Sequence, residues 1–239
     1  MKILIIVAHP DDEVLGMGGT IKKLAKEGHN IKIVILATGI TSRRSPNYSN
    51  STDYKLDKKL ENITKKQLKE LQKDAKNASK ILGVTKLTMM NFPDNEMDKI
   101  TNLEITKTIE KIINEFKPQI VYTHSEYDLN IDHRIIHNAV LTATRPSQKF
   151  TVKKVITFEV PSSTEWNFSK KFIPNIFVDI SKELSVKTRA MKAYQNEIRK
   201  FPHPRSMEGL EIIAKRWGTV SGFRAAEAFC LIREFTEKF

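Results

Sequence analysis

Residues 2–13 read KILIIVAHPDDE, an apolar run that passes directly into a histidine, a proline and three acidic residues. The part at 2–8 is unbroken and rich in β-branched side chains, a pattern typical of a strand that is buried on both faces of a parallel sheet. In open α/β sheets, ligands bind beyond the carboxyl ends of the strands. The polar segment 9–13 therefore indicates a site at the end of this first strand.

The remainder of the chain alternates short apolar runs with longer helical patterns, which predicts a βαβ architecture. Further strands are expected at 31–37, 86–91, 120–123, 152–160 and 175–180. Helices are expected at 17–27, from the end of the polar segment 38–57 to residue 82, from Thr101 to the residue before Pro118, at about 132–144, at 182–198 with Ser181 as its N-cap, and at 206–216. Residues 225–233 fit either a strand or a helix. No repeat, low-complexity tract or linker interrupts the pattern, so we expect residues 1–239 to form a single α/β domain.

Of the 239 residues, 40% are hydrophobic, as in an ordinary globular protein. This composition excludes a disordered, collagen-like or coiled-coil chain. Lys and Arg number 40 against 28 Asp and Glu, a formal charge of +12 that favours anionic partners. The lysines are dispersed, however, as on solvated helix faces, and neither a nucleic-acid motif nor a phosphate loop accompanies them. We therefore expect no nucleic-acid partner and disfavour a phosphate-handling transferase.

Three further features concern the cell compartment. The only cysteine, Cys230, excludes an intramolecular disulfide and any multi-cysteine metal motif, and it fits a reducing compartment. The N-terminal apolar run at 3–8 is shorter than the roughly 7–15 residues of a signal-peptide core. No apolar run approaches the ~18 residues of a membrane span. We expect a soluble, cytoplasmic protein.

The adjacent acids Asp11 and Asp12 would repel each other unless a cation or a proton lay between them. A bound divalent metal resolves that repulsion. The alternative is that one of the two residues serves only as the N-cap of the following helix. A cap needs one such side chain, whereas the segment offers three carboxylates and a histidine, so we favour the metal.

A second polar segment, 128–133, follows the expected strand at 120–123. If that strand lies beside the first one in a doubly wound sheet, His133 approaches the first segment. His9, Asp12 and His133 then supply two imidazoles and one carboxylate, the ligand set of a catalytic zinc site with an open position. Asp11 would be left as a carboxylate that can take a proton from the metal's water.

These two segments resemble the motifs of the LmbE-like, or PIG-L-type, family of zinc-dependent N-acetyl-sugar deacetylases. That family carries Ala/Pro-His-Pro-Asp-Asp-Glu after its first strand and His-x-Asp-His after a later one, and the first motif is intact at residues 8–13. The resemblance covers nearly the whole chain, including the stretch 222–229. It implies a Rossmann-like, mostly parallel sheet with helices on both faces, a zinc ion on His9, Asp12 and His133, and Asp11 as the general base.

The sequence departs from the family at Asn130, where the second motif normally begins with a histidine. In the family this histidine is held to stabilise the oxyanion or to help protonate the leaving amine. An asparagine amide donates a hydrogen bond but delivers no proton near neutral pH. Either Asp11 performs both proton transfers, or another residue replaces the histidine; His124 and Asp128 are candidates.

Three further residues are candidates for substrate binding. Arg43 and Arg44 lie in the long polar segment, where the family places substrate-contacting arginines; simple surface exposure is the alternative. Asp94, in the turn after the strand at 86–91, either contacts sugar hydroxyls or belongs to an ordinary turn.

The resemblance implies a hydrolase that removes an acetyl or other short acyl group from an amino sugar such as N-acetylglucosamine, from a nucleotide sugar or from another sugar conjugate. The alternative is a non-catalytic carbohydrate-binding or regulatory protein with a degenerate metal site. Iron or another divalent ion is the alternative to zinc, and assembly as a homo-oligomer stays open.

Overall fold

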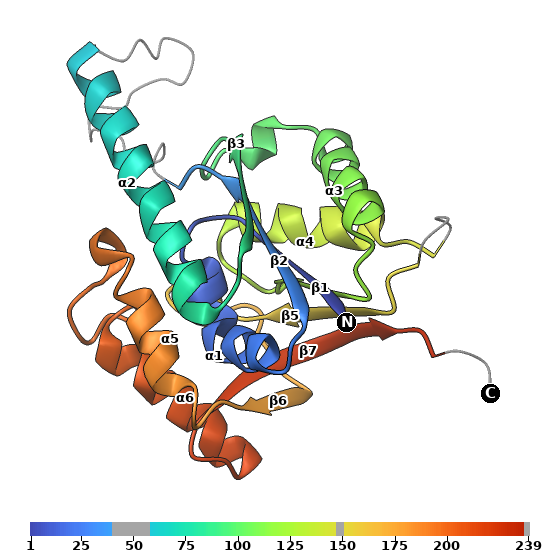
Figure 1. The fold of residues 1–239 in the computed structure, drawn as a ribbon, viewed down its shortest axis with the longest axis vertical. Helices are drawn as coiled ribbons and strands as arrows, with labels where there is room; N and C mark the ends of the chain where they lie inside the picture. The colour runs from blue at the N-terminus through green and yellow to red at the C-terminus, as the bar shows by residue number, and fades with distance from the viewer. Residues whose placement is uncertain (40–57, 147–150, 237–239) are drawn as a thin grey trace.

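The computed structural model describes residues 1–39, 58–146 and 151–236. Arg43 and Arg44 lie outside the described residues. The described part is built on one seven-stranded sheet with helices packed on both faces (Figure 1). This confirms the predicted α/β, Rossmann-like class, while the single-domain interpretation of residues 1–239 stays a prediction.

The sheet has the strand order β3-β2-β1-β4-β5-β7-β6. Its strands are β1 (Lys2–Val7), β2 (Asn30–Ala37), β3 (Lys86–Phe92), β4 (Ile120–His124), β5 (Lys154–Phe158), β6 (Ile176–Asp179) and β7 (Ala226–Glu234). The first five strands in the spatial order pair in parallel, and β7 runs antiparallel to both β5 and β6. The sheet is therefore mixed but mostly parallel, and β1 lies beside β4 as predicted.

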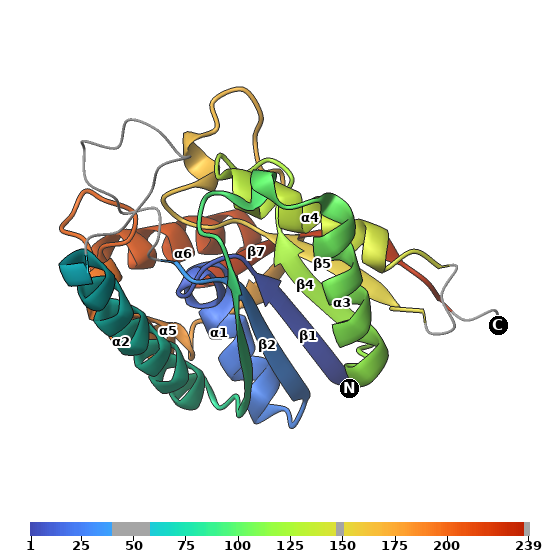
Figure 2. The same cartoon turned by 90° about the horizontal axis from the view of Figure 1, so that it is seen from above.

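Two helical layers cover the sheet. The helices are α1 (Asp12–Lys26), α2 (Lys58–Leu82), α3 (Asn102–Phe116), α4 (Ile131–Ala143), α5 (Leu184–Met191) and α6 (Met207–Ser221), with short 3-10 turns at Met97–Lys99 (η1), Thr164–Trp166 (η2) and Gln195–Glu197 (η3). Figure 2 shows α1, α2 and α5 on one face of the sheet and α3 and α4 on the other. None of the described helices combines the length and hydrophobicity that a membrane span needs.

The side chains of β1 explain why its apolar run is unbroken. Ile3 and Ile5 pack into the core on the side of α1, α2 and α5, whereas Leu4 and Ile6 pack on the side of α3 and α4. Each strand residue from Ile3 to Val7 is buried. Both faces of this strand are covered, so none of its side chains faces water. Its sequence therefore does not alternate between apolar and polar residues.

The first helix starts earlier than its apolar pattern predicts. It begins at Asp12 rather than residue 17, and it is broken at Met17, whose φ of −147° and ψ of 25° are not helical. A Cβ added to Gly16 would lie 2.3 Å from a ring carbon of Phe158, and one added to Gly19 would lie 2.8 Å from Ile180. These two glycines therefore allow the broken helix to approach the sheet closely.

Near the C-terminus the structure decides one open alternative and corrects one expectation. Residues 226–234 form β7 and not a helix; the first half of the strand is buried on both faces, which removes the usual alternation. The helix expected at 182–198 spans only Leu184–Met191. Ser181 does not cap it, because its hydroxyl donates to Asp179 Oδ1 (2.5 Å) and accepts from the backbone of Ala225 (3.3 Å), tying β6 to β7.

Candidate metal centre

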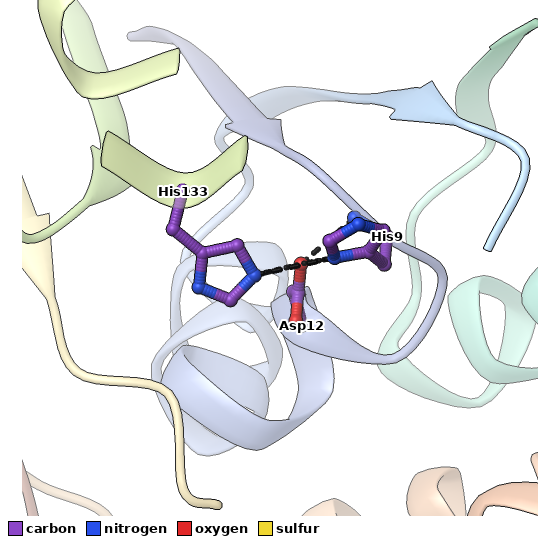
Figure 3. Close-up of side chains that lie close together, drawn as sticks. All are labelled: His9, Asp12 and His133. Carbon is purple, nitrogen blue, oxygen red and sulfur yellow. Dashed lines mark hydrogen bonds and ion pairs between the residues drawn. The ribbon is translucent and has the colours of Figure 1, made fainter. Parts of the chain in front are cut away.

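The candidate site lies at the carboxyl ends of two neighbouring strands. His9 and Asp12 follow β1, and His133 lies in the first turn of α4, just beyond β4 (Figure 3). The parallel pairing of β1 with β4 places the ends of these strands side by side. The structure thus brings together the three residues that the sequence analysis proposed as metal ligands.

The three potential ligand atoms form a small triangle. Nε2 of His133 lies 3.2 Å from Nδ1 of His9 and 3.2 Å from Oδ2 of Asp12, and the His9 and Asp12 atoms are 3.5 Å apart. Metal–ligand bonds of about 2.0–2.1 Å in a tetrahedral site place ligand atoms ~3.3 Å from one another. The observed spacing therefore fits a small divalent ion such as zinc.

Burial supports the same interpretation. Asp12 and His133 are 0% and 2% exposed, and Oδ1 of Asp12 has no hydrogen-bond partner among the described residues. Burial lowers the pKa of His133, but the carboxylates of Asp12 and Asp128 more than compensate and raise it to about 9. A site that holds a proton so firmly between carboxylates is one where a cation can take the proton's place.

Asp128 contacts Nδ1 of His133, the ring nitrogen that does not face the ligand triangle. Its Oδ2 lies 3.1 Å from Nδ1 of His133 and accepts a hydrogen bond from the Thr164 hydroxyl (2.7 Å), and its Oδ1 accepts from the Ser163 hydroxyl and from the backbone of Asn130 (2.8 Å). Burial raises the pKa of Asp128, but His133 and the hydroxyl donors lower it to about 2. The carboxylate is thus ionised and placed to orient the ligand imidazole.

Asp132 binds the ring nitrogen of His9 that does not face the ligand triangle, as Asp128 does for His133. The sequence had given no such role to Asp132. Its Oδ2 accepts from Nε2 of His9 (3.1 Å) and from the backbone of Asn95 (2.7 Å), and its Oδ1 accepts from the backbone of Met97 (3.1 Å). His9, Asp94 and Asp132 are also close enough to form a second ligand group. Because two backbone N–H groups already bind the Asp132 oxygens, we assign Asp132 to orienting His9. Its position directly before His133 was the available sequence signal.

Asp94 lies against His9 and not at an open surface. Its Oδ1 is 3.1 Å from Nε2 of His9, and the residue is 2% exposed. The turn that holds it also supplies the backbone groups that bind Asp132. Asp94 therefore belongs to the support of the imidazole in this structure, whereas its contact with a sugar stays a prediction.

His124 lies in the interior of the protein, against the ring of His133. The ring stacks on that of His133 with centroids 3.9 Å apart, and its Nε2 accepts a hydrogen bond from the backbone of Ala8 (2.8 Å). Burial, reinforced by His133, holds the pKa of His124 well below its usual value. The imidazole is fully buried and its Nε2 is already engaged by the backbone, so this placement gives His124 a packing role.

Asn130 is the N-cap of α4. Its side-chain oxygen accepts from the backbone of Asp132 (2.9 Å), and its amide nitrogen donates to the side chain of Asn95 (2.7 Å). Asparagine is among the preferred N-cap residues because its short side chain reaches the unpaired N–H groups of the first turn. The departure from the family motif at this position thus has a local structural role.

Asp11 lies at the N-cap position of α1 but makes no side-chain capping hydrogen bond, so the capping alternative for this residue is wrong. Its backbone is left-handed, with φ at 99°. Oδ2 accepts from Arg205 (2.9 Å), while Oδ1 is buried and has no hydrogen-bond partner among the described residues. Burial raises the pKa of Asp11 well above its usual value, although Arg205 acts in the opposite direction. Arg205 lies outside both polar motifs, and no local pattern in the sequence marks it as part of this site.

Comparison with known proteins agrees with this geometry. Residues 4–144 match the family described as PIG-L, GlcNAc-PI de-N-acetylase. The chain is 30% identical over 234 residues to the diacetylchitobiose deacetylase of Thermococcus kodakarensis, covering 95% of this chain and 81% of that protein.

Solved structures show the same fold at lower identity. The zinc-inhibited form of the teicoplanin deacetylase Orf2 has a TM-score of 0.74 at 17% identity, with both chains covered in full. GalB, the 4-carboxy-2-hydroxymuconate hydratase of Pseudomonas putida KT2440, has a TM-score of 0.71 at 19% identity and covers 100% of this chain and 99% of its own. The fold by itself therefore does not specify a deacetylase. The match over residues 4–144 and the identity over nearly the whole chain show that the protein belongs to the PIG-L family.

Proposed function

We propose that this protein is a metal-dependent hydrolase that removes an acetyl, or another short acyl, group from the nitrogen of an amino sugar or sugar conjugate. The observation that carries the proposal is the buried triangle of His9, Asp12 and His133 beside Asp11, whose Oδ1 has no hydrogen-bond partner among the described residues. Membership of the PIG-L family and the name of the Thermococcus relative support this reaction class.

His9, Asp12 and His133 would hold the ion. Two nitrogen donors and one carboxylate suit zinc, and they also suit iron. When bound, such an ion polarises the amide carbonyl and lowers the pKa of water to about 7. Asp132 and Asp128 fix the orientation of the two imidazoles, so the ligand nitrogens face the same point.

Asp11 performs the proton transfers. Its Oδ1 accepts a proton as water attacks the acyl carbon, and the same oxygen returns this proton to the nitrogen as the carbon–nitrogen bond breaks. The products are the free amine of the sugar and acetate. Asn130 caps α4, His124 is buried, and the ionised Asp128 is held against His133. We therefore assign none of them as a second proton donor, and Asp11 serves both steps.

The substrate is an N-acetylated sugar, a nucleotide sugar or a sugar conjugate. We propose that Arg43 or Arg44 binds an anionic group of such a substrate and that the protein acts in the cytoplasm. The alternative is a carbohydrate-binding protein without activity.

Acetate release from a panel of N-acetylated sugars tests the proposal. The panel includes N-acetylglucosamine, diacetylchitobiose, nucleotide sugars and glycolipid head groups, each with protein reloaded with one equivalent of Zn²⁺ or Fe²⁺. We expect release with at least one substrate, its loss on chelation, and no turnover by Asp11→Asn at full metal content. Sugar binding without acetate release from any substrate would instead support the non-catalytic alternative.

A further inference from the structure

Arg205 reaches the candidate site from a part of the chain outside the region that matches the family description. It lies in the segment between η3 and α6, 194 residues beyond Asp11. Its side chain is 22% exposed and makes three contacts: NH1 donates to Asp11 Oδ2 (2.9 Å) and to Glu197 Oε2 (3.3 Å), and Nε donates to the hydroxyl of Ser162 (2.7 Å). These contacts hold the planar guanidinium in one orientation.

The carboxylate of Asp11 needs such an anchor. Rotation of an aspartate carboxylate about its last bond has broad, shallow preferences, so the rotamer does not fix where each oxygen points. In this site one oxygen, Oδ2, is bound by Arg205, and the other, Oδ1, is buried without a partner among the described residues. A single anchored oxygen determines the position of the second.

We infer that Arg205 is a positioning residue for the base: by binding Oδ2 of Asp11, it directs Oδ1 toward the point where the reacting water lies. The inference rests on the proposed function, because it presumes that Asp11 is the base. It adds a residue from the C-terminal third of the chain to the machinery.

Arg205 is also connected, through a short loop, to the residues that hold His133. Ser162, which receives the Arg205 Nε hydrogen bond, is followed by Ser163 and Thr164, whose hydroxyls bind Asp128. The side chain of Glu165 in turn accepts from the backbone of Ser162 (2.7 Å) and of Ser163 (3.1 Å). One short loop thus supports Asp11 through Arg205 and His133 through Asp128, and it sets the base and a ligand relative to each other.

Kinetics of two Arg205 variants and one control variant test the inference. Displacement of a reacting group by ~1 Å costs on the order of a hundredfold in rate. We expect Arg205→Met to lower kcat by roughly ten- to a hundredfold, with KM and bound metal near their wild-type values, and Arg205→Lys to retain part of the rate. Arg199→Met is the matched control, because among the described residues the Arg199 guanidinium donates only to the carbonyls of Asn196 and Ile198 in its own loop; it should behave as the wild type.

Chemical rescue separates positioning from a general structural role. The partial exposure of Arg205 leaves a path for a small cation into the space that Arg205→Ala creates. Added guanidinium, at concentrations well below those that unfold the protein, should restore several-fold activity to Arg205→Ala. It should restore none to Asp11→Asn, and sodium at equal ionic strength should be without effect.

A measurement without metal or substrate tests the contact itself. In metal-free protein, the unfolding midpoints of Arg205→Met, Asp11→Asn and the double variant should be non-additive, since contacting residues couple. The pair Arg199→Met and Asp11→Asn should be additive.

Wild-type kcat in Arg205→Met, or additive midpoints for the Arg205 and Asp11 variants, overturns the inference. Loss of kcat together with loss of bound metal and no response to guanidinium also overturns it, in favour of a structural role. Turnover by Asp11→Asn refutes the base assignment in the proposed function. An inactive Asp11→Asn beside a fully active Arg205→Met refutes only the role of Arg205.

Discussion

The ammonium of Lys187 lies 2.7 Å from the carboxylate of Glu227, and the two side chains, 5% and 3% exposed, join the two halves of the broken helix α1. Lys187 donates to the carbonyl of Leu15 at the end of the first half (2.8 Å). Glu227 accepts from the backbone of Gly19 (3.0 Å) and Thr20 (2.7 Å) at the start of the second half. The C-terminal motif at 222–229 thus contributes Glu227, which caps the second half of α1.

Breaking the Lys187–Glu227 pair should lower the free energy of unfolding. Removing one partner of a buried ion pair leaves an uncompensated charge, and such changes cost about 3–5 kcal/mol. We expect Glu227→Gln to lower the free energy of unfolding by about 3 kcal/mol in urea titrations. The matched control is Glu211→Gln at the Lys215–Glu211 pair, whose side chains are 62% and 47% exposed, and the loss there should be about 0–1 kcal/mol. Equal effects of the two substitutions would contradict a structural role for the buried pair.

The carboxylates behind the two histidines should tune metal affinity. We expect Asp128→Asn and Asp132→Asn each to weaken zinc binding about 10–100-fold in competition with a chromophoric chelator. His133→Ala should abolish measurable binding, since it removes a ligand. Asp98→Asn, an exposed carboxylate on η1, is the control and should bind as the wild type. Unchanged affinity in Asp132→Asn would refute the orienting role that we assign to Asp132.

Glu159 should make stability depend on pH. The half-buried carboxylate accepts a hydrogen bond from the Trp217 indole, and burial raises its pKa from the usual 4.5 to about 7, against the lowering effect of that bond. The folded protein therefore binds a proton that the unfolded chain releases between pH 4.5 and 7, so this group's contribution to stability falls as pH rises through that window.

The substitution Glu159→Gln removes the titration and keeps an oxygen for Trp217. Relative to the wild type, the variant should be unchanged near pH 4.5 and more stable by about 1–2 kcal/mol at pH 8, part of the full effect being screened by solvent. Thermal or urea unfolding across this range measures the difference. A stability difference that does not vary with pH would refute the raised pKa.

Asn130 should act mainly as a helix cap. We expect Asn130→Ala to lower the free energy of unfolding by about 1 kcal/mol and Asn130→Asp, which retains the capping oxygen, to lower it little. Asn130→His restores the residue usual in the family but removes the cap from the helix that carries His133, so we expect a raised KM and a lower kcat. A higher kcat with a new limb of the pH–rate profile near neutral pH would show instead that the chain lacks only a proton donor.

The sequence alone predicted strands β1 to β6, the carboxyl edge of the sheet and the set of His9, Asp12 and His133. These features depend on local patterns: a strand buried on both faces has no polar alternation, and two short polar segments follow two strands that parallel pairing sets side by side. Asp11 followed by elimination, as the carboxylate of that segment left free to take a proton, and the family resemblance implied the same role.

Tertiary structure alone decided what holds that set in place. Arg205 and Asp11 are 194 residues apart, and Glu227 is 208 residues from Gly19. No periodicity or motif relates such pairs, because their contact follows from how the C-terminal segments pack against α1. Tertiary context likewise made a strand of 226–234, since burial on both faces and the hydrogen bonds to β5 and β6 outweigh local helical preference.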